Sequence, residues 1–389
     1  MFKIRTYNVI SDVGLSRLPL DSYQVGPEVD DPDAIVLRSH KLHDESIPDS
    51  VIAVARAGAG VNNVPVDEYT GRGIVVFNTP GANANAVKEL VTAALLLGSR
   101  GILAGSNRVE EMTDIDDPEV MAKQMEKEKK AFGGTEIAGR TLGVIGLGAI
   151  GSLVANSALD LGMKVVGFDP ALSVEGAWRL SNRVERRESL EALLKVSDFV
   201  TLHVPAMEAT HKLIDATALS RFKPGATLIN LARGPVVDAD AVVKALDDGR
   251  LGGHITDFPI PDMLGRDDCI LLPHLGASTA EAEENCAMMA ADQLMDFLEN
   301  GNITNSVNYP QTRMARDGGY RITFANDNTP GVLGAVLSVL AEQEVNVIDM
   351  VNKSRNEMAY NIIDVESEPT EAIVAAIAAV KGVKQLRVL

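Results

Sequence analysis

Three polar residues follow apolar runs that read as β-strands, and their side chains could together oxidise a 2-hydroxy acid. They are Arg233, Asp262 and His274. An imidazole can take the proton of a hydroxyl group, and a guanidinium can bind the neighbouring carboxylate through two parallel hydrogen bonds. A carboxylate beside the imidazole would fix its tautomer and stabilise the imidazolium that forms. Each residue also has a simpler interpretation, because such an arginine can form a surface ion pair and such a histidine can cap a turn.

Residues 141–170 have the pattern of a dinucleotide-binding unit, which would supply an acceptor for the hydride lost in such an oxidation. The apolar run 142–145 predicts a strand, and the apolar residues that follow the glycines recur at helical spacing. Gly146 would form a tight turn, and Gly148 would let backbone N–H groups approach a pyrophosphate. Gly151 would let the helix pack closely on the strand, with its N-terminus facing the anion.

Asp169 ends the second strand of this unit, where a carboxylate accepts hydrogen bonds from the ribose hydroxyls of a dinucleotide. It would also repel the 2′-phosphate of NADP, and no lysine or arginine follows it before Arg179. The cofactor that the sequence predicts is therefore NAD. A glycine-rich turn by itself occurs in many α/β proteins, but here the strand, the helix and the spaced acid accompany it.

Short apolar runs alternate with helical patterns along most of the chain, which predicts an α/β protein with two doubly wound parallel sheets. Ligands of such sheets lie beyond the carboxyl ends of the strands, so polar residues there are the first candidates for a site. A region rich in Glu, Lys, Asp and Met, 106–138, predicts a solvated helix. The expected strands are 34–37, 51–55, 74–77, 142–145, 199–204, 226–230, 254–257 and 270–272, and the expected helices include 86–100 and 279–300.

The last 70 or so residues follow a different pattern, with strands separated by shorter helices. The pattern predicts a small βαββαβ domain. It contains no catalytic group of residues, which favours a regulatory role. Its expected strands are 320–325, 347–352, 359–365 and a last one near 386, and its expected helices are 331–343 and 370–380.

The composition indicates a globular chain of more than one domain, because 389 residues with 46% hydrophobic content exceed one typical core. A net charge of −18 argues against a nucleic-acid or anionic-membrane partner, so a basic site for an anionic substrate must be local. Cys269 and Cys286 lack the spacing of metal ligands, and no metal site is expected. With no signal-peptide pattern and no long apolar run, the expected location is the cytoplasm.

Three motifs, at 146–151, 230–238 and 273–279, resemble those of the D-isomer-specific 2-hydroxyacid dehydrogenases, and the resemblance extends from about residue 30 to 310. The tail resembles an ACT domain at 328–333 and 345–347. The resemblance implies a Rossmann-type NAD domain inserted in a flavodoxin-like substrate domain, followed by the ACT domain. The implied boundaries are 1–92 and 281–309 for the substrate domain, 93–280 for the NAD domain and 318–389 for the ACT domain.

By resemblance, Arg233 binds the substrate carboxylate and His274 is the acid/base. The family pairs this histidine with a glutamate, and Asp262, one methylene shorter, falls at that position. The segment from Asp262 to His274 is also shorter than the family pattern, which leaves Asp267 and Asp268 as alternatives.

The resemblance also assigns binding residues around these catalytic positions. The implied NAD site consists of Thr79, Gly146, Gly148, Ala149, Ile150, Gly151, Asp169, Val204, Leu231, Ala232, Arg233, Asp257, His274 and Gly276. The implied substrate residues are Arg38, Ser39, Lys41, Gly58, Ala59 and Gly60, and those for an effector are Asn328 and Asn346.

The activity that this resemblance implies is oxidation of 3-phospho-D-glycerate to 3-phosphohydroxypyruvate, the first step of L-serine biosynthesis, with L-serine as a possible effector. A homodimer or homotetramer is expected. The same chemistry on another 2-hydroxy acid, such as the reduction of glyoxylate or hydroxypyruvate, is the nearest alternative. A non-catalytic protein that senses a dinucleotide is a further alternative, against which His274 and Arg233 weigh.

Overall fold

The computed structural model describes residues 1–316 and 318–389, and it divides the chain into two compact units. The first unit comprises residues 1–83 and 280–389, and the second comprises 84–279. The boundary expected at residue 92 falls inside a helix, and the tail belongs to the first unit. Assigning these parts to substrate, cofactor and effector stays a prediction.

The first unit contains a parallel five-stranded sheet with the order β2-β1-β3-β4-β5, which is the flavodoxin-like order. Its middle strand β3 is buried along its whole length, as expected for a parallel sheet covered on both faces. The strands are β1 (Phe2–Tyr7), β2 (Tyr23–Gly26), β3 (Ala34–Leu37), β4 (Ala53–Arg56) and β5 (Val75–Phe77). The accompanying helices are α1 (Asp12–Leu15), α2 (Val66–Gly71) and α11 (Ala280–Asn300).

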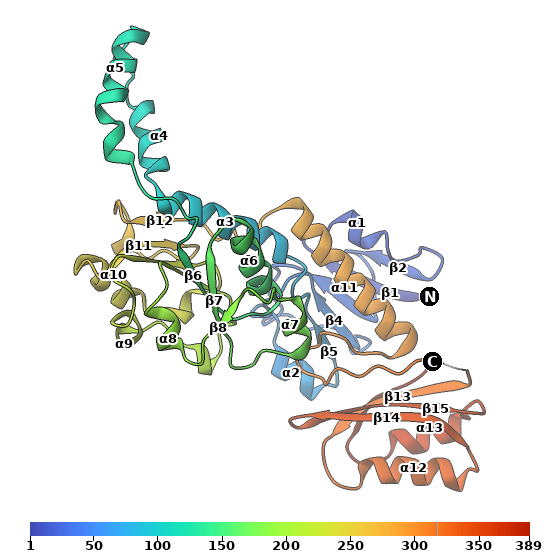
Figure 1. The fold of residues 1–389 in the computed structure, drawn as a ribbon. Coiled ribbons are helices and arrows are strands. Elements are labelled where there is room, and N and C mark those ends of the chain that lie inside the picture. The colour runs from blue at the N-terminus through green and yellow to red at the C-terminus, as the bar shows by residue number, and fades with distance from the viewer. Residues whose placement is uncertain (317) are drawn as a thin grey trace. The chain divides into compact units, whose positions relative to one another are not determined.

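The second unit contains a parallel seven-stranded sheet with the order β12-β11-β10-β9-β6-β7-β8 (Figure 1). The chain turns to opposite sides of β6 in the two halves, which is the Rossmann arrangement predicted from the sequence. Its strands are β6 (Thr141–Ile145), β7 (Lys164–Phe168), β8 (Glu185–Arg186), β9 (Phe199–Leu202), β10 (Ala226–Asn230), β11 (Leu251–Thr256) and β12 (Cys269–Leu271). Its helices are α3 (Ala84–Ser99), α4 (Ile102–Glu110), α5 (Pro118–Glu128), α6 (Ala149–Asp160), α7 (Val174–Arg179), α8 (Leu190–Leu194), α9 (Ala216–Leu219) and α10 (Ala239–Asp247).

The single solvated helix expected over 106–138 is wrong, because the structure has two helices, α4 and α5, that lie side by side. The side chain of Asp117 accepts the N–H of Glu119 at 2.8 Å, and Pro118 takes the first helical position. A capping acid followed by proline starts a new helix. Neither helix has a buried residue, so the solvated character is confirmed. Of the described helices, none has the length and apolar character needed to span a membrane.

The tail forms the predicted βαββαβ arrangement, with an antiparallel sheet of order β14-β15-β13-β16. Side chains on one face of the sheet, including Phe324 and Ile363, form a core with its helices. Side chains on the other face, including Tyr360, join the core of the first unit with Phe77 and Phe297. The elements are β13 (Tyr320–Asp327), α12 (Val332–Glu342), β14 (Val347–Arg355), β15 (Met358–Val365), α13 (Glu371–Ala378) and β16 (Val383–Val388).

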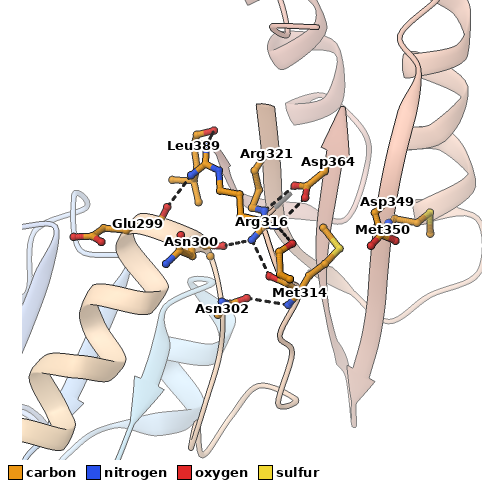
Figure 2. A network of polar contacts seen from close by, with 12 residues as sticks. Glu299, Asn300, Asn302, Met314, Arg316, Arg321, Asp349, Met350, Asp364 and Leu389 are labelled. Carbon is orange, nitrogen blue, oxygen red and sulfur yellow. Dashed lines mark hydrogen bonds and ion pairs between the residues drawn. The ribbon is translucent and has the colours of Figure 1, made fainter. Parts of the chain in front are cut away.

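A fully buried arginine holds the tail sheet to the segment that precedes it (Figure 2). Arg321 forms a bidentate ion pair with Asp364, with both N···O distances at 2.7 Å. Its remaining N–H groups donate to three backbone carbonyls, of Asn300, Met314 and Ala315. A buried ion pair is stable only when its remaining hydrogen-bonding groups also have partners. Because these partners come from the linker, the end of α11 and the sheet, Arg321 holds the three together.

Replacing Arg321 with methionine should therefore destabilise the first unit by about 3–5 kcal/mol, because the Asp364 carboxylate would stay buried without a cation. Denaturant unfolding measures this change. Arg316 is the matched control, since it is exposed and also donates to backbone carbonyls. We expect Arg316→Met to cost less than about 1 kcal/mol. Equal losses for the two variants would contradict this account of Arg321.

Candidate active site

The residues predicted to bind the cofactor in the second unit cluster at the carboxyl edge of its sheet. They follow β6, β7, β9, β10, β11 and β12, which are neighbours in the strand order. The glycine-rich turn follows β6, beside the point where the strand order reverses. Ligands of open α/β sheets bind at this place.

The three glycines of the turn meet three different constraints. Gly146 has φ +86°, and a Cβ on Gly151 would lie 1.9 Å from the carbonyl oxygen of Gly146. Gly151 therefore lets α6 approach the turn. A Cβ on Gly148 would meet no atom within 4 Å, and this residue is exposed just before α6 begins at Ala149. The open space at the start of the helix fits a pyrophosphate, so the residues present suit a dinucleotide.

Asp169, at the end of β7, holds the turn from the other side. Its two carboxylate oxygens accept the N–H groups of Leu147 at 2.8 Å and Ala171 at 2.9 Å. A carboxylate has about four acceptor positions, so Asp169 can still bind ribose hydroxyls. Its half-buried position beside the turn agrees with that role.

The loop that carries Arg233 is held by a buried asparagine at the end of β10. The Asn230 side chain donates to the carbonyl of Arg233 at 3.0 Å and accepts the N–H of Ala232 at 3.2 Å. The Arg233 guanidinium is half-buried and donates to the carbonyl of Ala232 at 2.7 Å. A guanidinium has five donors, so Arg233 keeps enough of them to bind a carboxylate.

The loop that carries His274 is held by Asp257, which is 3% exposed at the end of β11. Its oxygens accept the N–H groups of Leu275 at 3.0 Å and Gly276 at 2.8 Å, and its own N–H donates to the carbonyl of Asn230 at 3.2 Å. We call Asn230 and Asp257 the polar bracket. Because its two members are bonded to each other, the bracket ties the loops of Arg233 and His274 together.

His274 has a left-handed backbone, with φ +58°, and an exposed side chain. Its ring centroid lies 4.9 Å from that of Phe258. A non-glycine residue in this conformation costs of order 1–3 kcal/mol and persists only where the surroundings impose it, which is common at active sites. Here the carboxylate of Asp257 accepts the N–H groups of the two following residues, which holds the backbone in this conformation.

The predicted partner of His274 is exposed in a short turn, Pro261–Met263. In the described part of the chain, the Asp262 carboxylate has no hydrogen bond or ion pair, so its pairing with His274 stays a prediction. Asp268 forms hydrogen bonds of 2.8 and 2.9 Å with Arg266, which hold its pKa below the usual range. This engagement weighs against Asp268 as the alternative. The described residues contain no group of metal-ligating side chains that could hold an ion.

The predicted substrate residues of the first unit lie on a loop that follows β3. The side chain of Asn8 accepts the N–H groups of Ser39 at 3.1 Å and His40 at 2.6 Å. The side chain of Asn63 donates to the carbonyls of Arg38 at 3.1 Å and His40 at 2.6 Å. The loop that carries Arg38, Ser39 and Lys41 is therefore held by two asparagines. Asn8 binds its backbone N–H groups, and Asn63 binds its backbone carbonyls.

No motif in the sequence indicates a role in the substrate site for Arg56, the last residue of the buried strand β4. Its Nε donates to the carbonyl of Arg38 at 3.0 Å. A Cβ on Gly58 would lie 1.6 Å from its Nη1, so the guanidinium lies against the predicted glycine loop. An arginine that ends a buried strand in an acidic chain is the signal that could have identified it. Thr79, predicted to bind NAD, lies beside the same glycine loop, because its N–H donates to the carbonyl of Gly58 at 3.1 Å.

The structure separates the two predicted effector residues. Asn328 donates to the carbonyl of Asn356, beyond the end of β13, where Asp327 lies opposite Met358. Asn346 precedes β14 and donates to Glu366, at the end of the sheet where β13 begins. With about 3.3 Å per residue, the eight residues of β13 place the two asparagines about 23 Å apart. One chain cannot bring both to one small effector.

Comparison with known proteins agrees with this architecture. The family model for the "D-isomer specific 2-hydroxyacid dehydrogenase, NAD binding domain" matches residues 102–276. A D-3-phosphoglycerate dehydrogenase of Escherichia coli (strain K12) is 34% identical over 388 residues, which cover 95% of this chain and 90% of that protein. One from Synechocystis is 37% identical over 329 residues, covering 80% of this chain and 56% of that protein.

Solved structures show the same fold. The apo form of Rhodotorula graminis D-mandelate dehydrogenase has a TM-score of 0.66 at 26% identity, covering 81% of this chain and 99% of that one. NAD⁺-bound 3-phosphoglycerate dehydrogenase of Entamoeba histolytica has a TM-score of 0.60 at 24% identity, covering 79% and 98%. The fold and the glycine turn define an NAD-dependent dehydrogenase. The chain belongs to the D-isomer specific 2-hydroxyacid dehydrogenases.

Two glycine variants test the cofactor site. We expect Gly148→Ala to leave the thermal unfolding midpoint within a few degrees, because its Cβ meets no atom, yet to weaken NADH binding roughly tenfold or more. Gly151→Ala should instead lower the midpoint, because its Cβ overlaps a backbone carbonyl and overpacking costs about 1–3 kcal/mol. Fluorescence titration with NADH measures binding. Unchanged NADH affinity in Gly148→Ala would contradict the placement of the pyrophosphate.

A second prediction concerns the loop after β3. Asn63→Asp would set a carboxylate oxygen against the carbonyls of Arg38 and His40, which removes two donated hydrogen bonds. We expect the KM for the acid substrate to rise roughly tenfold, while NADH affinity, a property of the second unit, stays unchanged. The control is Asn62→Asp, which adds the same charge at an exposed neighbour. Similar KM values for the two variants would contradict the role of Asn63 in holding this loop.

Proposed function

We propose that this chain oxidises 3-phospho-D-glycerate to 3-phosphohydroxypyruvate with NAD, which is the first step of L-serine biosynthesis. The observation that carries the proposal is the similarity to D-3-phosphoglycerate dehydrogenases along nearly the whole chain, tail included. The cations around the loop after β3 support it, because they give a strongly acidic chain a local site for a phosphate.

In the proposed reaction, Arg233 orients the substrate by binding its carboxylate through two parallel hydrogen bonds. His274 accepts the proton of the C2 hydroxyl, so that the C–O bond becomes a carbonyl as the hydride leaves C2. NAD, when bound at the glycine turn, supplies the hydride acceptor. The proton stays on the imidazole as an imidazolium, which Asp262 would stabilise in the proposed pairing.

The phosphate would be bound by Arg38, Ser39 and Lys41, and Arg56 is a further cation of the same loop region. Gly58, Ala59 and Gly60 offer backbone groups without bulky side chains. This basic loop favours a phosphorylated substrate over the alternatives of glyoxylate or hydroxypyruvate, which carry no phosphate. The polar bracket, which holds a histidine and an arginine in place, weighs against a non-catalytic dinucleotide sensor.

We also propose that the tail is an ACT domain that binds L-serine between two copies of the chain. Strand β14 is at the edge of its sheet. Antiparallel pairing of two such edges would bring Asn346 of one copy to the end of the sheet that holds Asn328 of the other. This arrangement overcomes the separation of the two asparagines in one chain. This arrangement requires a homodimer or homotetramer. The proposed location of the protein is the cytoplasm.

The assay for the proposed function follows NADH at 340 nm, a general property of this cofactor, with phosphohydroxypyruvate, hydroxypyruvate and glyoxylate as competing keto acids. We expect phosphohydroxypyruvate to have the highest kcat/KM. Replacing His274 with asparagine should lower kcat by roughly 10²–10⁴, while NADH affinity changes little. Preference for an unphosphorylated acid would reject the proposed substrate, and full activity of His274→Asn would reject the proposed base.

Regulation is tested by titrating L-serine into the same assay. We expect millimolar serine to lower the velocity, and we expect Asn328→Ala and Asn346→Ala each to remove that response without changing the uninhibited rate. Gln343→Ala, at an exposed position near the end of α12, is the control and should keep it. A velocity independent of serine would show that serine is not an effector. An unchanged response to serine in Asn328→Ala and Asn346→Ala would show that these asparagines do not bind it.

A further inference from the structure

The arginine proposed to bind the phosphate already has an anionic partner. Nη1 of Arg38 lies 2.5 Å from Oε1 of Glu283, in the first turn of α11. The side chains are 34% and 45% exposed, so both can reach solvent and exchange partners. A carboxylate therefore occupies the guanidinium on which a substrate phosphate would bind.

The backbone of Arg38 cannot move away to escape this competition. Its carbonyl accepts hydrogen bonds from Arg56 and Asn63, and the following N–H groups are bound by Asn8. Glu283 is likewise fixed at the backbone, because it belongs to a 21-residue helix. Only the two side chains can rearrange when an anion arrives.

The buried thiol of Cys286, near the pair, adds no negative charge at neutral pH. Cys286 lies one helical turn after Glu283 and is buried. Burial raises the pKa of this thiol, although Arg38 and Arg56 are close enough to oppose that effect. The thiol therefore stays neutral near pH 7, and Glu283 is the anion that faces Arg38 from α11.

We propose that Glu283 lowers the affinity of the protein for the phosphate of the substrate, which must displace it from Arg38. This inference rests on the proposed function, because it assigns the phosphate to Arg38. A phosphate with close to two negative charges binds a guanidinium more strongly than a carboxylate does, so it can take its place. Glu283 then lies near the phosphate and repels it, which weakens binding and speeds release of the product. A substrate without a phosphate leaves the pair intact.

The displacement of Glu283 from Arg38 and its repulsion of the bound phosphate both oppose binding. Removing the charge of Glu283 should therefore strengthen binding of phosphorylated substrates and of no others. In Glu283→Gln, we expect the KM for phosphohydroxypyruvate to fall roughly three- to tenfold, the range set by one exposed ion pair and one nearby like charge. The KM for hydroxypyruvate should stay within about twofold, and kcat for both should change less than KM. Rising salt should reduce the difference in KM for phosphohydroxypyruvate between Glu283→Gln and the unmodified protein, because exposed charges are screened.

Two further variants make the test specific. Glu281→Gln removes the same charge two residues away, at an exposed position of the same turn, and should leave both KM values unchanged. In an Arg38→Ala background, Glu283→Gln should lower the KM for phosphohydroxypyruvate by a smaller factor than in the unmodified protein, because the competition for Arg38 is gone and only the repulsion of the phosphate is left to remove.

The outcomes separate the inference from the function on which it rests. If the unmodified protein reduces phosphohydroxypyruvate and Glu283→Gln leaves its KM unchanged or raises it, the inference is wrong and the proposed function stands. An equal fall of KM for hydroxypyruvate would also overturn it, because the effect would not depend on the phosphate. If the unmodified protein does not reduce phosphohydroxypyruvate, both are overturned.

Discussion

The buried hydrogen bond between Asn230 and Asp257 is the contact on which the candidate active site depends. It joins the ends of two neighbouring strands, and each partner holds one loop that carries a catalytic candidate. A buried carboxylate is costly unless its oxygens are satisfied, and Asp257 accepts two backbone N–H groups. The same bonds impose the left-handed backbone of His274. The positions of Arg233 and His274 are thus consequences of how two strands end, and we expect them to be set before any ligand binds.

A comparable arrangement fixes the loop after β3, where Asn8 and Asn63 bind its backbone and leave its cationic side chains to bind anions. In both places a polar side chain binds the backbone of the loop that carries the functional residues. Arg321 likewise binds the backbone beside the tail, since it donates to the carbonyl of Asn300 at the end of α11 and to two carbonyls of the linker. Each loop is therefore supported by polar side chains that bind its backbone, and hydrogen-bonding groups left unpaired there would be costly.

Sequence reasoning predicted the sheets well because buried parallel strands such as β3 and β10 are continuous apolar runs. It named no strand at β1, whose residues Phe2–Tyr7 mix apolar and basic side chains. The bracket could not be predicted, because its hydrogen bonds join residues up to 27 apart through strand pairing. For the same reason the sequence suggested neither the Arg38–Glu283 pair nor the opposite placement of Asn328 and Asn346.

The claim that the active site is organised before ligands bind is tested most directly by hydrogen exchange in the full chain without NAD or substrate. The amides of Leu275 and Gly276 belong to a loop, and an unsupported loop exchanges rapidly. Because both amides donate to the buried Asp257 carboxylate, the account predicts exchange as slow as that of the neighbouring strand β11. Rapid exchange that becomes slow only after NAD is added would contradict the account, since the ligand would then be what assembles the site.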